Sequence, residues 1–158
     1  MHYPCKRIAL RQNHIMFAIV SLMVYLLLFA NARATAALDD EAWDKLVWDY
    51  SDFTSNFAQQ NWQGVYPYIR DDSKIGFGGE TGISGLKQIY GDGGQCFKDM
   101  VPALKQGCKK RQQGPDPGCD APPQWSDPSV IYLGARAGFS YDTKRHKWRV
   151  TYLICGGD

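Results

Sequence analysis

Residues 129–158 read SVIYLGARAGFSYDTKRHKWRVTYLICGGD, and they carry the strongest strand signal in the chain. Two runs rich in aromatic and β-branched residues, 129–141 and 147–155, flank the polar sequence DTKRHK, which predicts an antiparallel hairpin with a polar tip. Strict alternation puts Trp148, Val150, Tyr152 and Ile154 on one face and Arg149, Thr151, Leu153 and Cys155 on the other. Neither face is wholly polar, so we expect one to pack on helices and the other to be partly covered by a long loop.

Helical periodicity precedes the hairpin. Apolar residues recur at steps of three and four from Trp43 to Phe57, behind an acidic first turn, and predict an amphipathic helix over about 39–60. Two short helices follow, one from Ser84 to Gly91 and one that Asp99 can cap.

The remaining segments predict turns, one short strand and one loop. Residues 74–77 fit a strand that leads into GFGGETGISG, a glycine-rich turn rather than a phosphate loop, because the Gly-Lys-Ser/Thr ending of that motif is absent. Residues 109–128 contain five prolines without periodicity and predict a surface loop. The expected class is α+β, with an N-terminal amphipathic helix and two short helices packed on a small antiparallel sheet that ends in the long hairpin.

Residues 1–36 have the layout of a secretory signal. Three basic residues precede the apolar run 15–30. Cleavage after Ala36 satisfies the small-residue rule through Ala34 and Ala36, and cleavage after Ala34 satisfies it through Ala32 and Ala34. The alternative is an uncleaved anchor, but the run is shorter than the roughly 20 residues that a membrane span needs. We therefore expect a single exported domain over 37–158, periplasmic or secreted, without stable membrane association.

Removing the signal changes the net charge. Residues 1–36 hold four of the 18 basic residues and none of the 16 acidic ones, so 14 basic and 16 acidic residues remain, a net charge of −2. No global positive field would then attract nucleic acid, which we do not expect as a partner.

Four cysteines remain after Cys5 leaves with the signal, and an even number in a small exported chain indicates two disulfides. No Cys-x-x-Cys pair is present, so we expect neither a metal site nor a cofactor. A largely helical 96–108 would hold Cys96 and Cys108 too far apart to bond. This leaves Cys108–Cys119 with Cys96–Cys155, which we favour, or Cys96–Cys119 with Cys108–Cys155.

The cationic hairpin tip has three interpretations. His146 and Cys155 would be a poor catalytic pair, because the cysteine would have to stay reduced in an oxidising compartment. Nucleic-acid binding through Lys144, Arg145, Lys147 and Arg149 around Trp148 conflicts with the net charge. A solvated tip is favoured, and contact with an acidic protein or an anionic polymer is the functional alternative.

The order of elements resembles small exported members of the NTF2-like, or cystatin-like, cone fold. The resemblance rests on FTSNFAQQNWQGVYPYIRDD before the first strand and on GFSYDTKRHKWRVTYLI, in which a tryptophan begins the last strand. It implies a cone with an opening that relatives use for catalysis, ligand binding or protein contact, and it transfers no functional residue.

Two functions follow as hypotheses. The first is a non-enzymatic binding protein, such as an inhibitor or immunity-type protein, that contacts another protein through Trp62, Tyr66, Tyr68 and Trp125. The alternative for these aromatic residues is that they cover the core beneath the loops. The second function is a small cone-fold enzyme in which Asp71, Asp72 or Glu80 acts as a general base. An exposed Glu80 favours the binding protein, and a buried Glu80 that faces a cavity favours the enzyme.

Overall fold

The structure is a computed structural model that describes residues 20–25, 40–111 and 117–156. The chain divides into two compact units, Met1–Asp40 and Glu41–Asp158. In the first unit, residues 20–25 are helical with exposed side chains, and the predicted cleavage sites lie outside the described residues. Within the described ranges, no helix has the length and apolar character of a membrane span.

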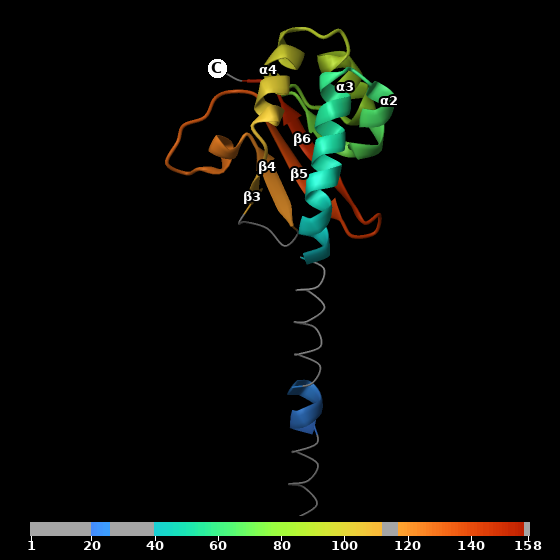
Figure 1. Ribbon diagram of the computed structural model, residues 1–158, viewed down its shortest axis with the longest axis vertical. Helices are drawn as coiled ribbons and strands as arrows, with labels where there is room; N and C mark the ends of the chain where they lie inside the picture. The colour runs from blue at the N-terminus through green and yellow to red at the C-terminus, as the bar shows by residue number, and fades with distance from the viewer. Residues whose placement is uncertain (1–19, 26–39, 112–116, 157–158) are drawn as a thin grey trace, which may run out of the picture. The chain divides into compact units, whose positions relative to one another are not determined.

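The second unit has the predicted α+β class (Figure 1). It begins with a long helix over residues 40–58, here called the long helix. The other elements are α2 (Trp62–Val65), η1 (Tyr66–Tyr68), β1 (Ile69–Ile75), β2 (Glu80–Thr81), α3 (Gly82–Tyr90), α4 (Gln95–Lys105), β3 (Lys109–Arg111), β4 (Gly118–Ala121), η2 (Pro123–Ser126), β5 (Arg136–Asp142) and β6 (Lys147–Ile154).

The described strands form a six-stranded sheet in the order β2-β1-β6-β5-β4-β3. The hairpin β5–β6 occupies its centre and is antiparallel, as predicted. β1 lies parallel to β6, and the other neighbouring pairs are antiparallel. Because β1 needs a parallel partner from the far end of the chain, local sequence cannot specify this pairing.

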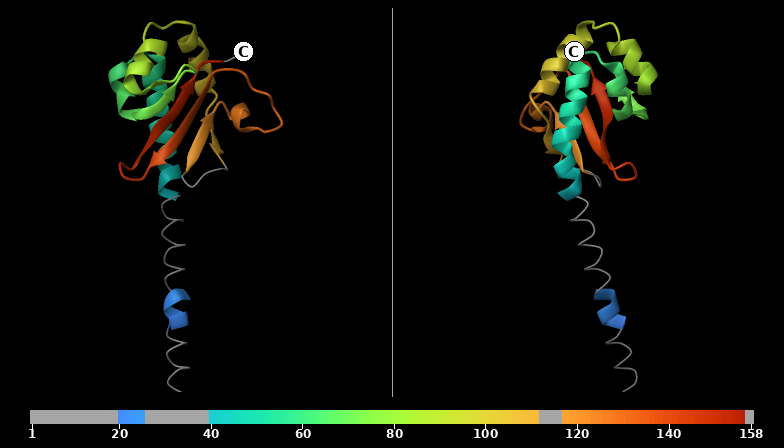
Figure 2. Two further views of the ribbon diagram at one scale, coloured as in Figure 1. Left: turned by 180° about the vertical axis from the view of Figure 1, so that it is seen from behind. Right: turned by 45° about the vertical axis from the view of Figure 1, so that its right-hand side comes forward.

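The long helix packs against one face of the sheet (Figure 2). Its aromatic side chains meet the sheet directly: Tyr50 and Phe53 contact Phe139 of β5 edge-to-face, with ring centroids 5.2 Å apart in each pair. Asp49 accepts a hydrogen bond of 2.8 Å from the backbone N–H of Trp148 on β6. The apolar stripe that predicts the helix is therefore the stripe that forms the core.

A bulge in the hairpin corrects the predicted alternation along β6. Gly138 pairs with Tyr152 and Phe139 pairs with Val150, so Thr151 is an extra residue in the ladder. Before the bulge, Trp148 and Val150 both face the core, as predicted. After the bulge, Tyr152 lies on the opposite face and Leu153 lies in the core. An extra residue reverses the facing of everything after it, and periodicity alone does not reveal it.

The segment predicted as a surface loop contains sheet structure. β3 and β4 extend the sheet beyond β5, and every residue of β4 is buried. The sequence Gly-Cys-Asp-Ala is too short for periodicity and is flanked by prolines, so only pairing with β5 identifies it as a strand.

Two other boundaries differ from the prediction. β1 begins at Ile69 rather than Lys74, and α4 begins at Gln95, four residues before the expected cap Asp99. Asp99 lies inside α4, where its carboxylate accepts a hydrogen bond of 2.7 Å from the side chain of Gln95. The glycine-rich turn after β1 is present as predicted, with Gly76 and Gly79 at positive φ.

Two disulfides join the pairs of cysteines that the sequence analysis favours. Cys96 in α4 bonds to Cys155 after β6, with a Cα–Cα distance of 5.1 Å. Cys108 bonds to Cys119 in β4, with a Cα–Cα distance of 5.6 Å. The first bond fixes the end of the central strand to a helix, and the second holds β3 beside β4.

Candidate functional site

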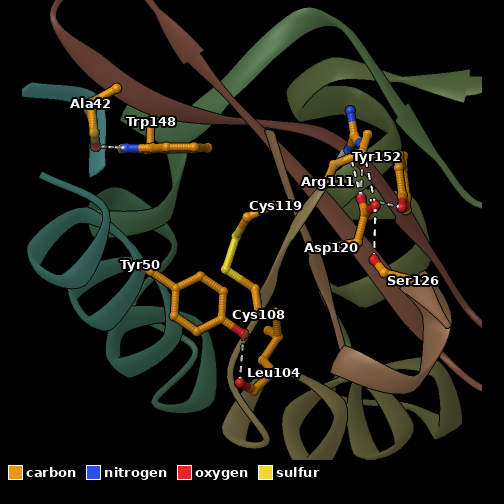
Figure 3. Close-up of a disulfide and its surroundings, with 10 residues drawn as sticks. All are labelled: Ala42, Tyr50, Leu104, Cys108, Arg111, Cys119, Asp120, Ser126, Trp148 and Tyr152. Carbon is orange, nitrogen blue, oxygen red and sulfur yellow. Dashed lines mark hydrogen bonds and ion pairs between the residues drawn. A yellow bond between two sulfur atoms is a disulfide. The ribbon is translucent and has the colours of Figure 1, made fainter. Parts of the chain in front are cut away.

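The face of the sheet opposite the long helix carries a polar network centred on Asp120. We call this the open face and define it by Arg111, Asp120, Arg136 and Tyr152. Cys119 points to the helix side while its neighbour Asp120 points to the open face (Figure 3). This separation follows from the two-residue repeat of β4.

Three elements besides β4 supply the partners of the Asp120 carboxylate. Arg111 of β3 donates through Nε and Nη2, with Nε 3.0 Å from Oδ2. Tyr152 of β6 donates its hydroxyl to Oδ1 at 2.8 Å. Ser126 of η2 donates to Oδ2 at 3.1 Å.

Gly138 leaves the space that allows the Tyr152 side chain to extend to Asp120. It lies on β5, between Asp120 of β4 and Tyr152 of β6 in the sheet register. A Cβ at this position would collide with the Tyr152 ring. The ring therefore occupies the space that any other residue would fill, and its hydroxyl crosses to the neighbouring strand.

Arg111 and Tyr152 of this network both keep their protons at physiological pH. The hydrogen bonds to Asp120 raise the pKa of Arg111 above its ordinary value. Burial, and then the negative charge of Asp120, raise the pKa of Tyr152. The tyrosine is neutral at physiological pH and acts as a donor. With Arg111, Tyr152 and Ser126 all donating to it, Asp120 has its lone pairs occupied and is poorly suited to act as a general base.

The outer edge of this network is aromatic and exposed. The Trp125 indole donates Nε1–H to the Tyr152 hydroxyl at 2.7 Å. The Arg136 guanidinium carbon lies 4.4 Å from the Trp125 ring centroid and 5.1 Å from that of Phe77. Arg136 thus bridges two aromatic rings, an arrangement with favourable cation–π interactions.

An apolar loop continues from this stack. Residues 127–135 connect η2 to β5 and project away from the sheet (Figure 2). Ile131 is 91% exposed, and Val130 and Leu133 are also exposed. Exposed apolar side chains grouped beside aromatic residues typify interaction surfaces.

A cleft of about 400 Å³ lies between β3 and η2. Its lining residues are Lys109, Lys110, Arg111, Asp120, Trp125, Ser126 and Pro128. The cleft adjoins the aromatic stack through Trp125.

The aromatic residues that were predicted to bind a partner differ in how deeply they are buried. Trp125 lies in the candidate site. Trp62 and Tyr66 are half-buried and pack against the core, as the alternative interpretation expects. Tyr68 and Trp148 are buried, which corrects their predicted surface roles. A core tryptophan on a central strand cannot stack on a ligand.

The local contacts of these two rings explain their burial. The Trp148 indole donates to the carbonyl of Ala42 on the long helix. Tyr68 donates its hydroxyl to Asp52 on the same helix, and the Lys147 ammonium lies 3.8 Å from the Tyr68 ring centroid. Lys147 is thereby drawn onto the protein surface, while Lys144 and Arg145 remain exposed at the tip.

A larger cavity of about 720 Å³ brings several of the other predicted residues together. It lies between the beginning of β1 and the hairpin tip, and its lining includes Tyr66, Asp71, Asp72, Lys144 and Arg145. Its charges are largely paired internally: Arg70 binds Asp72 at 2.8 Å, and the buried Arg149 lies 3.5 Å from the Asp142 carboxylate. We therefore favour the open face as the candidate site.

Glu80 is neither fully exposed nor buried against a cavity, the two arrangements that would distinguish a binding protein from an enzyme. It is half-buried, and its carboxylate folds over the turn at Gly76 and Gly78. One of its oxygens is buried without a hydrogen-bond partner in the described part of the chain. Glu80 lines neither the cleft nor the larger cavity.

Sequence reasoning missed most of the site. Asp120 and Arg111 lie in the proline-rich stretch, where no local signal marks them. Tyr152 lies in a predicted strand, but on the face opposite to the one predicted. No sequence signal distinguishes Arg136 and Phe77. Their role follows from the fold, in which Arg136 lies between the rings of Phe77 and Trp125.

Across the residues that the structure describes, no group of histidine, cysteine and acidic side chains could hold a metal ion. Comparison of the sequence with family models finds no match, and neither does comparison with curated proteins or with solved structures.

Proposed function

We propose that this chain is an exported, disulfide-stabilised binding protein of the inhibitor or immunity type, which contacts another protein through its open face. The observation that carries the proposal is the Phe77–Arg136–Trp125 stack, which is exposed but anchored to Asp120 through Tyr152. Two disulfides are compatible with the periplasm or the extracellular medium as its compartment.

The stack has the composition of an interface hot spot. Tryptophan and arginine are enriched among the residues whose truncation costs about 2 kcal/mol or more of binding energy. Trp125 is held by a hydrogen bond and by Arg136 before any partner arrives. A preordered side chain loses little conformational entropy on binding, so more of the contact energy is available for affinity.

Two features favour contact over catalysis. The buried carboxylate on the open face is already saturated with donors, and Glu80, the carboxylate on which the enzyme hypothesis depends most, does not face the cleft. The exposed apolar side chains of the loop beside the stack, Val130, Ile131 and Leu133, would add contact area for a partner.

Affinity capture with matched variants tests the proposal. The purified exported protein, Trp125→Phe, Trp125→Ala and Arg136→Ala would each be incubated with the exported fraction of the native organism, and retained proteins quantified by mass spectrometry. Trp48→Ala is the control, because Trp48 is 78% exposed on the long helix, away from the open face.

We expect a partner that the wild type and Trp48→Ala retain equally and that Trp125→Ala loses by about tenfold or more. Trp125→Phe should keep an intermediate share, because it preserves an aromatic ring without the hydrogen bond to Tyr152. Circular dichroism would verify that each variant is folded. Equal retention by all folded variants, or no specifically retained protein, would contradict the proposal.

A further inference from the structure

β3 ends the sheet with an edge that no described strand covers. In the described part of the chain its only strand partner is β4, with Lys109 opposite Asp120 and Arg111 opposite Gly118. The backbone groups on the other side of β3 are thus without a strand partner in this part of the chain. Such an edge can accept an additional strand from another molecule.

The cleft beside this edge is cationic. Its lining holds three basic residues and one acidic residue. Because Lys110 directs its ammonium to the other face of the sheet, Lys109, Arg111 and Asp120 leave a net charge of +1 in the cleft. The acidic residue is Asp120, whose charge Arg111 already neutralises. This contrasts with the net charge of −2 that we expect for the exported chain as a whole.

Lys109 is the cation best placed to meet a ligand. It is exposed and forms no ion pair with any carboxylate in the described ranges. The nearby Asp127 carboxylate accepts hydrogen bonds from Ser129, which lower its pKa, and the charge of Lys109 lowers it further. Lys110 alternates to the other face, where its ammonium lies 4.4 Å from the Trp43 ring centroid.

The Cys108–Cys119 disulfide makes this short edge a fixed feature. A three-residue strand has little stability of its own. The bond joins the residue immediately before β3 to the middle of β4, so it holds the edge in position against the sheet.

We propose that the β3 edge and the cationic cleft bind an extended, acidic segment of a partner protein by strand addition. The inference rests on the proposed function and specifies the partner's chemistry. Carboxylates at alternate positions of the added strand would lie on one face, beside Lys109 and the mouth of the cleft. The intervening apolar side chains of the segment would lie on the other face, the face to which Lys110 points.

Fluorescence anisotropy with a defined peptide tests this inference. The probe is a short fluorescein-labelled peptide in which glutamate alternates with valine. Three matched ligands accompany it: the same peptide with glutamine in place of glutamate, the glutamate peptide with alternate backbone nitrogens methylated, and a single-stranded DNA oligonucleotide of similar charge.

The protein variants are matched in charge. Lys109→Glu alters the proposed site, and Lys144→Glu makes the same change at the exposed hairpin tip. We expect Lys109→Glu to weaken binding of the glutamate peptide about tenfold and Lys144→Glu to change it by less than about twofold. Binding to the wild type should weaken as salt rises.

The ligands separate charge from strand pairing. Both the glutamine peptide and the N-methylated peptide should bind about tenfold more weakly than the glutamate peptide. Equal losses in the two lysine variants, undiminished binding of the methylated peptide, or equally tight binding of DNA would each overturn the inference. So would absence of binding by the wild type.

The capture experiment distinguishes this failure from that of the proposed function. If retention of a partner depends on Trp125 but not on Lys109, the open face remains the proposed interface. The proposal that the partner adds an acidic strand to β3 is then rejected.

Discussion

Gly138 is the residue on which the position of Tyr152 depends. We predict that Gly138→Ala displaces the Tyr152 ring, because the added Cβ would occupy the same space. The hydrogen bonds from Tyr152 to Asp120 and from Trp125 to Tyr152 would then be lost. Overpacking of this kind typically destabilises a protein by about 1–3 kcal/mol. Urea-induced unfolding would measure the loss.

Ser140→Ala is the matched control for Gly138→Ala. Ser140 lies two residues further along β5 on the same face, and its substitution should change the free energy of unfolding by less than about 0.5 kcal/mol. An equally small effect at Gly138 would show that the Tyr152 ring can move at little cost, and would weaken the case for a preordered Trp125.

The central strand β6 depends on the disulfide at its end. Closing the 59-residue separation between Cys96 and Cys155 stabilises the fold by about 4 kcal/mol in the chain-entropy model. The 11-residue separation between Cys108 and Cys119 gives about 3 kcal/mol. We therefore predict that Cys155→Ser lowers the free energy of unfolding more than Cys119→Ser does, as measured in urea.

Peptide mapping without reduction provides the control for these two variants. It should recover the fragments that contain Cys96 and Cys155 joined to each other. A free thiol at Cys155 in protein purified without reductant would contradict the structural role of this cysteine and would reopen its pairing with His146.

The basic residues of the hairpin tip should contribute unequally to the free energy of unfolding. Lys144→Ser and Arg145→Ser should each change the free energy of unfolding by less than about 0.5 kcal/mol, because both side chains are exposed. Lys147→Ser should cost about 0.5–1 kcal/mol, since its ammonium packs on the Tyr68 ring. Thermal unfolding of the three single variants would test this order, and equal effects would argue against the contact with Tyr68.

Glu41 contributes to the stability of the whole fold at neutral pH, where the start of the long helix meets the hairpin. Hydrogen bonds with His146 and Tyr141 lower the pKa of Glu41 from its ordinary 4.5. A carboxyl group whose pKa is lower in the folded state stabilises the fold above its unfolded pKa. This stabilisation is lost as the pH falls through the lower, folded value.

We accordingly predict that Glu41→Gln is less stable than the wild type at neutral pH and that the difference shrinks as the pH falls below the ordinary Glu pKa of 4.5 and through the lower, folded value. Urea unfolding across a pH series would show the two curves converging. Asp44→Asn is the control, because Asp44 is exposed on the same helix and makes no hydrogen bond or ion pair within the described residues. A constant gap at all pH values would contradict the role of Glu41.

Features that local chemistry controls could be predicted from the amino-acid sequence. Helical periodicity placed the long helix, with observed bounds of 40–58 against the expected 39–60, and the glycines predicted the turn after β1. The hairpin followed from two β-rich runs around a polar tip. The favoured cysteine pairs followed from the length of a helix, because a rigid helix separates its ends whatever surrounds it.

The open face could not be predicted from the sequence, because it forms through long-range packing. The bulge at Thr151 turns Tyr152 outward, and β4 exists as a strand because β5 lies beside it. Trp148 looks like a surface residue next to four cations, yet the long helix buries it. Asp120 acquires its partners from β3, η2 and β6, and the most distant of them, Tyr152, lies 32 residues away from it in the sequence. Such contacts depend on which elements pack together, and that outcome is a property of the whole fold rather than of any local pattern.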